Sequence, residues 1–249
     1  MTVVPDLEAA TAQEVLDWGM EAFGERLAIC TSFQAEGMAI LDMAAGHNPA
    51  VRVFTIDTGR LPGETYDLIE QVRRHYGIAV EVLMPDSEEV KAMATRHGPN
   101  LFYESAPKRM LCCEVRKARP LERKLGTLDA WVTGLRRGQG QSRAGVPKVE
   151  VDQAHGSIVK LNPLADWEAQ QVEEYNRSRG VPRHALYDRG YTSIGCGPCT
   201  RPTASGEDPR AGRWWWETDA RKECGIHFSP QGKAQRDVDI LLEEILHAV

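Results

Sequence analysis

The chain has 249 residues, of which 42% are hydrophobic and 27% are charged, enough for one large globular domain or two small ones. Acidic residues outnumber basic ones by 36 to 30, and the resulting net charge of −6 excludes a molecule whose whole surface binds nucleic acid. No apolar run approaches the roughly 18 residues of a membrane span, and residues 1–10 carry two acidic side chains and no export signal, so we expect a cytoplasmic protein.

The first part of the chain alternates short apolar runs with amphipathic stretches. We expect helices at residues 11–23, 37–45, 64–76 and 87–98, the last one capped by Ser87, and strands at residues 27–31, 51–56 and 79–84. Further strands are predicted at residues 128–133 and 157–161, followed by a helix from Asp166 to Arg179. This order predicts an α/β fold, with a mostly parallel twisted sheet and helices on both faces.

The last part of the chain has a different composition. Residues 195–230 are rich in Gly, Pro, Arg and Trp without a clear period, which is typical of a long functional loop. Residues 231–248 predict a closing helix that docks through one apolar face, made of Val238, Leu241, Leu242 and Ile245. We therefore expect an α/β domain at residues 1–200 and a C-terminal tail at residues 201–249.

Three loops are candidates for ligand binding, because ligands bind at the carboxyl ends of the strands in an open parallel sheet. Residues 31–37 open a helix whose first N–H groups can hold an anion, and residues 57–60 follow the second strand; a capped turn explains either loop equally well. Residues 133–143 place three arginines among glycines, which favours an anion site over a solvated basic loop. Neither a dinucleotide-binding motif nor a P-loop is present.

Four cysteines form two distant pairs, Cys112-Cys113 and Cys196-x-x-Cys199, and four thiolates can hold one metal centre. The second pair also has the same sequence as a thioredoxin redox motif. That motif lies at the start of a helix, whereas a Pro- and Gly-rich stretch follows Cys199 here. Zinc and iron–sulfur clusters both accept four cysteines. Adjacent cysteines on a helix diverge by about 100°, which favours a broad [4Fe–4S] cluster over one small ion.

A fifth cysteine, Cys224, lies between cationic residues in the segment 221–227 (RKECGIH). Nearby cations lower the pKa of a thiol and make the nucleophilic thiolate available. Cys30 lies in an apolar run instead and is predicted to be a core residue. Cys224 is therefore predicted to be a nucleophile.

Taken together, these motifs resemble the assimilatory adenylyl-sulfate (APS) reductases, within the wider phosphoadenylyl-sulfate (PAPS) reductase group. The resemblance rests on both cysteine pairs and on the segments TSFQAE at 31–36, IDTGR at 56–60, GLRR at 134–137, GRWWWE at 212–217 and ECGIH at 223–227. The paired cysteines distinguish the cluster-bearing APS enzymes from PAPS reductases, which lack them. The resemblance implies an adenine nucleotide α-hydrolase-like fold, with a C-terminal tail that closes over the site like a lid.

The resemblance also implies a reaction, the reduction of APS to sulfite and AMP in sulfate assimilation. Cys224 would attack the sulfur of APS, expel AMP and become a sulfonated cysteine, which thioredoxin would resolve. Because 25 residues follow Cys224, fewer than the fused redox domain of the plant members needs, we expect a separate thioredoxin or glutaredoxin as the reductant.

Residue roles follow from the same resemblance. Cys112, Cys113, Cys196 and Cys199 would ligate a [4Fe–4S] cluster, and Lys117 and His227 would assist Cys224 in catalysis. The residues expected to bind the substrate are Ser32, Gln34, Glu36, Thr133, Gly134, Arg137, Arg143, Arg210 and Arg213. The sequence leaves open whether the chain forms a homo-oligomer.

Three rival interpretations remain. The enzyme could also accept PAPS, whose extra phosphate needs a cationic pocket that the sequence does not identify. Alternatively, the chain is a zinc-stabilised nucleotide-binding or RNA-modifying module with an incidental Cys224, although its net acidity weighs against RNA. A thioredoxin-like oxidoreductase using Cys196 and Cys199 is the third.

Overall fold

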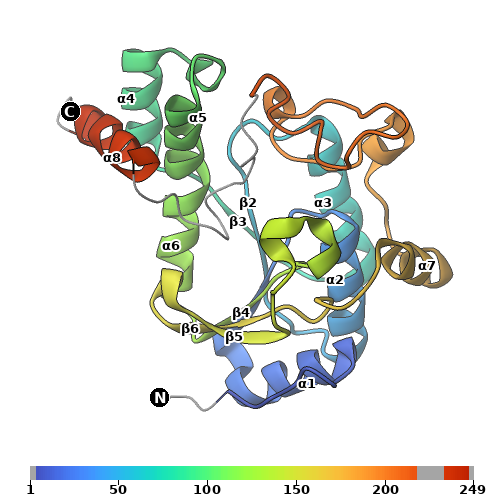
Figure 1. Ribbon diagram of the computed structural model, residues 1–249. Coiled ribbons are helices and arrows are strands. Elements are labelled where there is room, and N and C mark those ends of the chain that lie inside the picture. Colours follow the sequence, from blue (N-terminus) through green and yellow to red (C-terminus); the bar gives the residue numbers. More distant parts are fainter. Residues whose placement is uncertain (1–3, 218–232, 247–249) are drawn as a thin grey trace. The chain divides into compact units, whose positions relative to one another are not determined.

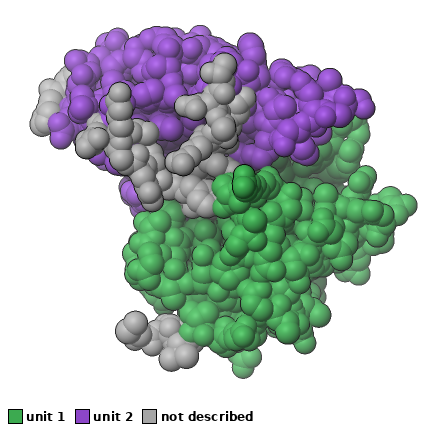
Figure 2. All heavy atoms as spheres, viewed as in Figure 1, with its two compact units in different colours: residues 1–55, 62–82, 125–190 green, residues 56–61, 83–124, 191–249 purple. Residues whose placement is uncertain are grey.

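The computed structural model describes residues 4–217 and 233–246, which belong to two compact units (Figure 2). Unit 1 comprises residues 1–55, 62–82 and 125–190, and unit 2 comprises residues 56–61, 83–124 and 191–249. These units are divided differently from the expected boundary at residue 200, because segments 56–61 and 83–124 pack with the chain that follows residue 190. The functional division into a domain and a tail remains a prediction.

Six strands form one sheet: β1 (Leu27–Cys30), β2 (Val53–Ile56), β3 (Val80–Leu83), β4 (Ala130–Val132), β5 (Val149–Asp152) and β6 (Ile158–Leu161). Their order is β3-β2-β1-β4-β6-β5. Strand β1 pairs in parallel with both β2 and β4, and β4 pairs in parallel with β6, whereas β5 is antiparallel to β6. The mostly parallel sheet is confirmed.

The burial of each strand explains whether it could be predicted from the sequence. Every residue of β2 and β4 is buried, as in strands covered on both faces, and such strands read as continuous apolar runs. Strand β5 was not predicted. It is an edge strand of sequence VEVD, whose Val151 is 38% exposed, so it lacks an apolar run.

Unit 1 contains the predicted helices α1 (Ala12–Phe23), α2 (Ala35–His47), α3 (Gly63–Tyr76) and α7 (Ala169–Arg179). Helix α1 begins with a capping box, in which Thr11 and Glu14 satisfy each other's backbone N–H groups. Helix α2 packs against α1 and α7 (Figure 1). The apolar faces of these helices bury Leu16, Leu41, Val72 and Val172 in one core.

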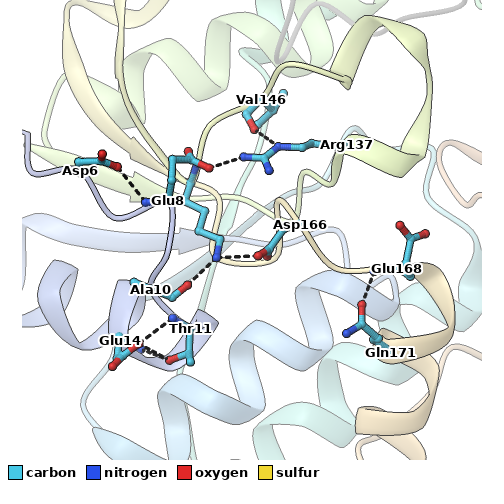
Figure 3. Close-up of polar contacts among 11 residues, drawn as sticks. Asp6, Glu8, Ala10, Thr11, Glu14, Arg137, Val146, Asp166, Glu168 and Gln171 are labelled. Atoms are coloured by element: carbon cyan, nitrogen blue, oxygen red, sulfur yellow. Dashed lines mark hydrogen bonds and ion pairs between the residues drawn. The ribbon is translucent and has the colours of Figure 1, made fainter.

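The predicted start of α7 at Asp166 is wrong, because its N-cap residue is Glu168. Backbone bonds from Ala165 to Asn162 and from Trp167 to Leu164 hold the preceding residues in turns. Asp166 instead forms an ion pair with the buried Lys148, in which Oδ2 of Asp166 lies 2.7 Å from Nζ of Lys148 (Figure 3).

In unit 2, helices α4 (Ser87–His97), α5 (Ala106–Cys113) and α8 (Lys233–Leu246) lie side by side (Figure 1). The predicted cap of α4 at Ser87 is wrong by one residue. Asp86 is the N-cap, and its carboxylate accepts hydrogen bonds from the N–H groups of Glu88 and Glu89 at 2.9 and 3.1 Å.

A continuous helical stretch that the sequence did not reveal carries Cys112 and Cys113. It comprises α5, a π-helical turn (Glu114–Ala118) and α6 (Arg119–Leu125). Pro120 has no N–H to donate to the carbonyl four residues earlier, and the wider turn lies directly before it. With prolines at positions 107 and 120, the segment does not read as one helix in the sequence.

The closing helix α8 is confirmed, and it docks as predicted. Val238 and Ile245 are 2% and 1% exposed, and Leu241 and Leu242 pack against the apolar core of unit 2. Across the part of the chain that the structure describes, no helix is both long and apolar enough to cross a membrane.

The docking of α8 can be tested with two identical substitutions on one helix. Ile245 is 1% exposed and Ile240 is 56% exposed. We expect Ile245→Ala to lower the free energy of unfolding by about 2–5 kcal/mol, because it leaves a core cavity. Ile240→Ala should change it by less than about 0.5 kcal/mol. Urea denaturation followed by tryptophan fluorescence measures both, and equal losses would contradict the docked arrangement.

Candidate functional site

The four cysteines predicted to bind metal line a single pocket in unit 2. Cys112 and Cys113 end helix α5, and Cys196 and Cys199 flank a one-turn 3-10 helix, Gly197–Cys199. The pocket is completed by Arg60, Phe102, Arg109, Arg116, Lys117 and Pro198. The fold therefore brings together two cysteine pairs that lie far apart in the sequence.

The turn between Cys196 and Cys199 is held by its backbone. The N–H of Cys199 donates to the carbonyl of Cys196 at 2.9 Å, and Gly197 N–H donates to the carbonyl of Arg60 at 2.8 Å. The hydroxyl of Tyr103 donates to the carbonyl of Pro198 at 2.9 Å. Thr200 then continues in extended conformation, so no α-helix begins directly after Cys199, as the sequence predicted.

Residues 57–60, which the sequence offered as an anion loop, lie next to the cysteine pocket, and Arg60 lines it. The hydroxyl of Thr58 lies 3.2 Å from the sulfur of Cys196. Arg116 donates to the carbonyl of Thr58 at 2.7 Å. Gly59 has a positive φ of 70°, which allows the chain to turn sharply between Thr58 and Arg60.

Burial disfavours the thiolate form of two of these cysteines. Cys112 and Cys199 are 8% and 7% exposed. Burial raises the pKa of Cys112 and raises the pKa of Cys199 to about 12, although Lys117 and Arg213 act in the opposite direction on Cys199. Because a metal centre displaces thiol protons, thiolates at these positions require such a centre or another strong positive charge.

The donor set of the pocket determines which groups it can hold. Four cysteines surround the pocket, together with the cations Arg60, Arg109, Arg116 and Lys117, so an anionic thiolate-bound group suits its charge. Among the described residues, no three His, Cys, Asp or Glu side chains converge on a position for one metal ion. The four cysteines of the pocket are the ligand type that both zinc and iron–sulfur clusters take.

Arg213, a predicted substrate ligand, is buried next to the second cysteine pair. An antiparallel bridge joins it to Thr200, and the N–H of Trp214 donates to the carbonyl of Cys199 at 3.1 Å. The guanidinium hydrogen-bonds to Ser193 and to the carbonyl of Ile194.

Gly195 is in close contact with the same guanidinium. A Cβ atom at position 195 would lie 2.4 Å from Nη2 of Arg213. Only glycine therefore fits the observed position of Arg213, directly before Cys196.

A second buried arginine, Arg109, fixes the segment that follows Trp214. It forms two hydrogen bonds with the carboxylate of Glu217 at 2.9 and 3.0 Å, and the two side chains are 2% and 8% exposed. The guanidinium carbons of Arg109 and Arg213 lie 4.6 and 4.8 Å from the ring centre of Trp214. The sequence did not single out Arg109, Glu217 or Trp214 individually.

The structure describes two of the four remaining predicted residues of unit 2. Lys117 lies on the π-helical turn and lines the pocket. Arg210 is half-buried in a turn where its N–H donates to Asp208 at 2.7 Å. Cys224 and His227 lie outside the described residues, so their catalytic roles remain predictions.

In unit 1, two predicted substrate loops meet at the carboxyl ends of adjacent parallel strands. The register of β1 with β4 aligns Ile29 with Val132, so the chain leaves both strands at the same edge of the sheet. A Cβ atom at Gly134 would lie 3.0 Å from Cβ of Glu36 and 3.3 Å from the nitrogen of Gly37. Gly134 therefore allows the second loop to touch the start of α2.

Glu36 lies in a network that Gln139 completes. Arg136 donates to the Glu36 carboxylate at 2.9 Å, and Gln139 donates to the same oxygen at 3.1 Å. Gln139 also accepts a hydrogen bond from Arg143 at 2.6 Å. Neither Arg136 nor Gln139 was named as a site residue, although both belong to the arginine-rich segment.

Two predicted residues of this loop make contacts within unit 1. The hydroxyl of Thr133 donates to the buried Asn162. Arg137 donates to the carbonyl of Val146 at 2.9 Å and to the carboxylate of Glu8 at 2.5 Å (Figure 3). Burial raises the pKa of Glu8, but the hydrogen bonds that the Lys148 N–H and Arg137 donate to its carboxylate outweigh that effect. The pKa of Glu8 therefore lies below its ordinary value.

Residues Ser32 and Gln34 lie in the loop before α2 and interact with each other. The amide of Gln34 donates to the hydroxyl of Ser32 at 3.1 Å. Between them, Phe33 is fully buried and has a φ of 57°, which is unusual for a residue other than glycine. The side chain of Thr31 accepts the N–H of Phe33 at 3.0 Å and stabilises this turn.

Comparison with known proteins identifies the relatives of this chain. A family profile described as the phosphoadenosine phosphosulfate reductase domain matches residues 26–202. Adenosine 5'-phosphosulfate reductase of Allochromatium vinosum is 46% identical over 83% of this chain and 82% of its own length. The Burkholderia cepacia protein of the same name is 43% identical over 89% of this chain and 90% of its own length.

A solved structure agrees. The phosphoadenylyl-sulfate reductase of Candida auris, in a phosphate complex, is 30% identical with a TM-score of 0.68 and covers 81% of this chain and 99% of its own. The expected adenine nucleotide α-hydrolase-like fold is confirmed. The chain belongs to the phosphoadenosine phosphosulfate reductase family, as its motifs indicated.

Proposed function

We propose that the protein is an APS reductase, which reduces adenosine 5'-phosphosulfate to sulfite and AMP in sulfate assimilation. The observation that carries this proposal is the pocket that Cys112, Cys113, Cys196 and Cys199 line together with four cations. Relatives named adenosine 5'-phosphosulfate reductase are 46% and 43% identical to the chain, which supports APS over PAPS as the substrate.

We propose that these four cysteines hold a [4Fe–4S] cluster. Bound in the pocket, the cluster would supply an anionic centre of four thiolate-ligated irons. Arg60, Arg116 and Lys117 would balance its charge from the pocket wall. The hydroxyl of Thr58, at 3.2 Å, would donate to the Cys196 thiolate once its proton is displaced.

The proposed chemistry belongs to Cys224. Its thiolate attacks the sulfur of APS, a sulfur–sulfur bond forms, and the bond from sulfur to the phosphate oxygen breaks, so that AMP leaves with the electron pair. Cationic Lys117, Arg210 and Arg213 are the groups proposed to offset the negative charge of sulfate and phosphate. His227 is proposed to assist the Cys224 thiolate.

The second half-reaction needs an external dithiol, for which we propose thioredoxin or glutaredoxin. The dithiol reduces the sulfonated cysteine, sulfite leaves with the electron pair of the broken sulfur–sulfur bond, and the dithiol is oxidised to a disulfide. The five described cysteines are all free, which suits a reducing compartment, and we propose the cytoplasm.

The function is tested by purifying the protein without air and measuring sulfite release with thioredoxin, once with APS and once with PAPS. We expect APS to be the preferred substrate. Faster release from PAPS would replace the proposal by a PAPS reductase, and release from neither nucleotide would refute both.

Cys224→Ser should abolish sulfite formation, because an alcohol is a far weaker nucleophile toward sulfur than a thiolate. The iron and sulfide contents should stay at the wild-type level, since Cys224 is not a proposed ligand. Enzyme assay and metal analysis of the same preparation check both expectations. Sulfite release at the wild-type rate would refute the proposed mechanism.

Cys199→Ala should lose the metal centre and most of the activity, whereas Cys30→Ala, a substitution of the same kind outside the pocket, should keep both. Wild-type protein should be brown, with about four irons and four sulfides per chain. A colourless wild-type protein with about one zinc would instead indicate the zinc module. An intact cluster in Cys199→Ala would refute the ligand assignment.

A further inference from the structure

Helix α2 begins at Ala35 without a cap from its own N-cap residue. The side chain of Gln34 makes no capping bond and donates instead to Ser32. The first N–H groups of a helix have no partner within the helix and require an acceptor from elsewhere. For Ala35 that acceptor is the hydroxyl of Tyr187, at 3.1 Å and 152 residues later in the sequence.

The opposite peptide group of Ala35 is also held by a distant side chain. The amide of Asn176, on α7, donates to the carbonyl of Ala35 at 2.9 Å. Thus Tyr187 and Asn176 bind the peptide groups on both sides of one residue. That residue lies between Gln34 and Glu36, two of the residues expected to contact the substrate.

Tyr187 is itself held by the rest of unit 1. It lies on a 3-10 helix, Ala185–Arg189, whose N-cap His184 is 1% exposed and lies 3.0 Å from the hydroxyl of Thr65 on α3. Arg189 on the same turn pairs with Glu64 at 2.6 Å. Because the turn is fixed to α3 at both ends, the hydroxyl of Tyr187 can hold the start of α2 in one position.

The loop that these residues hold has an unfavourable backbone conformation. Phe33 adopts a φ of 57° while fully buried, and such a conformation is unfavourable in a residue other than glycine. Hydrogen bonds from outside the loop offset that cost and exclude more relaxed conformations of residues 31–37.

We propose that Tyr187 and Asn176 are positioning residues for the nucleotide-binding loop 31–37. They fix the peptide groups flanking Ala35 and thereby the directions of Ser32, Gln34 and Glu36, without contacting the nucleotide. This inference rests on the proposed function, in which residues 31–37 bind the adenine nucleotide.

The test compares Tyr187→Phe with Tyr76→Phe in the cluster-containing protein. Each substitution removes one hydroxyl, but that of Tyr76 binds Asp42 at 3.0 Å, away from the loop. We expect Tyr187→Phe to raise the dissociation constant for AMP, measured by calorimetry, about 3- to 10-fold, as for one lost hydrogen bond. Tyr76→Phe should stay within about twofold of wild type, since a comparable bond is lost outside the loop.

Two further readouts distinguish positioning from general destabilisation. Hydrogen exchange at the amides of residues 33–37 should accelerate in Tyr187→Phe and in Asn176→Ala but not in Tyr76→Phe. The KM for APS should rise several-fold in Tyr187→Phe, while kcat stays within about twofold of wild type, since the removed contact acts on binding.

The outcomes separate the two proposals. If wild-type protein binds AMP and Tyr187→Phe binds it equally well, the positioning role is overturned and the proposed function stands. If Tyr187→Phe and Tyr76→Phe weaken binding alike, the effect is one of stability and the positioning role is also overturned. If wild-type protein neither binds AMP nor releases sulfite from APS, the proposed function fails, and the positioning role fails with it.

Discussion

The parallel pairing of β1 with β2 and β4 is the constraint on which the arrangement of the loops depends. Parallel strands release the chain at the same edge, so β1 and β4 bring residues 31–37 and 133–143 into contact. Gly134 suits that contact, since a Cβ atom there would lie only 3.0 Å from Cβ of Glu36 and 3.3 Å from the nitrogen of Gly37. Strand β2 continues into residues 57–60, which belong to unit 2, and Arg60 lines its pocket.

Each of the two units contains a buried arginine that is paired with a carboxylate. Arg136 and Arg109 are 7% and 2% exposed, and each is bound to a carboxylate, Glu36 or Glu217. Removing one partner from such a pair leaves an uncompensated buried charge, which is strongly destabilising. These arginines therefore fix the positions of loops, and Arg109 also lines the cysteine pocket, together with Lys117 and Arg116.

Elements with a clear pattern of apolar residues along the chain could be predicted from the sequence. Strands such as β2 read as apolar runs, and α8 shows its buried face in Val238 and Ile245. The sequence did not predict the helical stretch around Cys112, because Pro107 and Pro120 interrupt the pattern. In the structure Pro107 lies in the first turn of α5, and a π-helical turn precedes Pro120. Strand β5 was missed because it is a half-exposed edge strand.

The candidate site was predictable to a similar degree. The cysteines and the arginine-rich segment carry their chemistry in residue type and spacing, so motifs alone revealed them. Partners supplied from far along the chain had no such signal. The contacts of Thr58 with Cys196, of Tyr187 with Ala35 and of Arg109 with Glu217 arise only when the fold brings distant segments together.

The contact between Gly195 and Arg213 means that these two positions cannot vary independently. A side chain at position 195 would displace the guanidinium from Ser193 and from the ring of Trp214, and a shorter residue at position 213 would leave a void against a bare backbone. A substitution at either position therefore changes the surroundings of the other. Redesign of the segment before Cys196 has to consider the two residues as a pair.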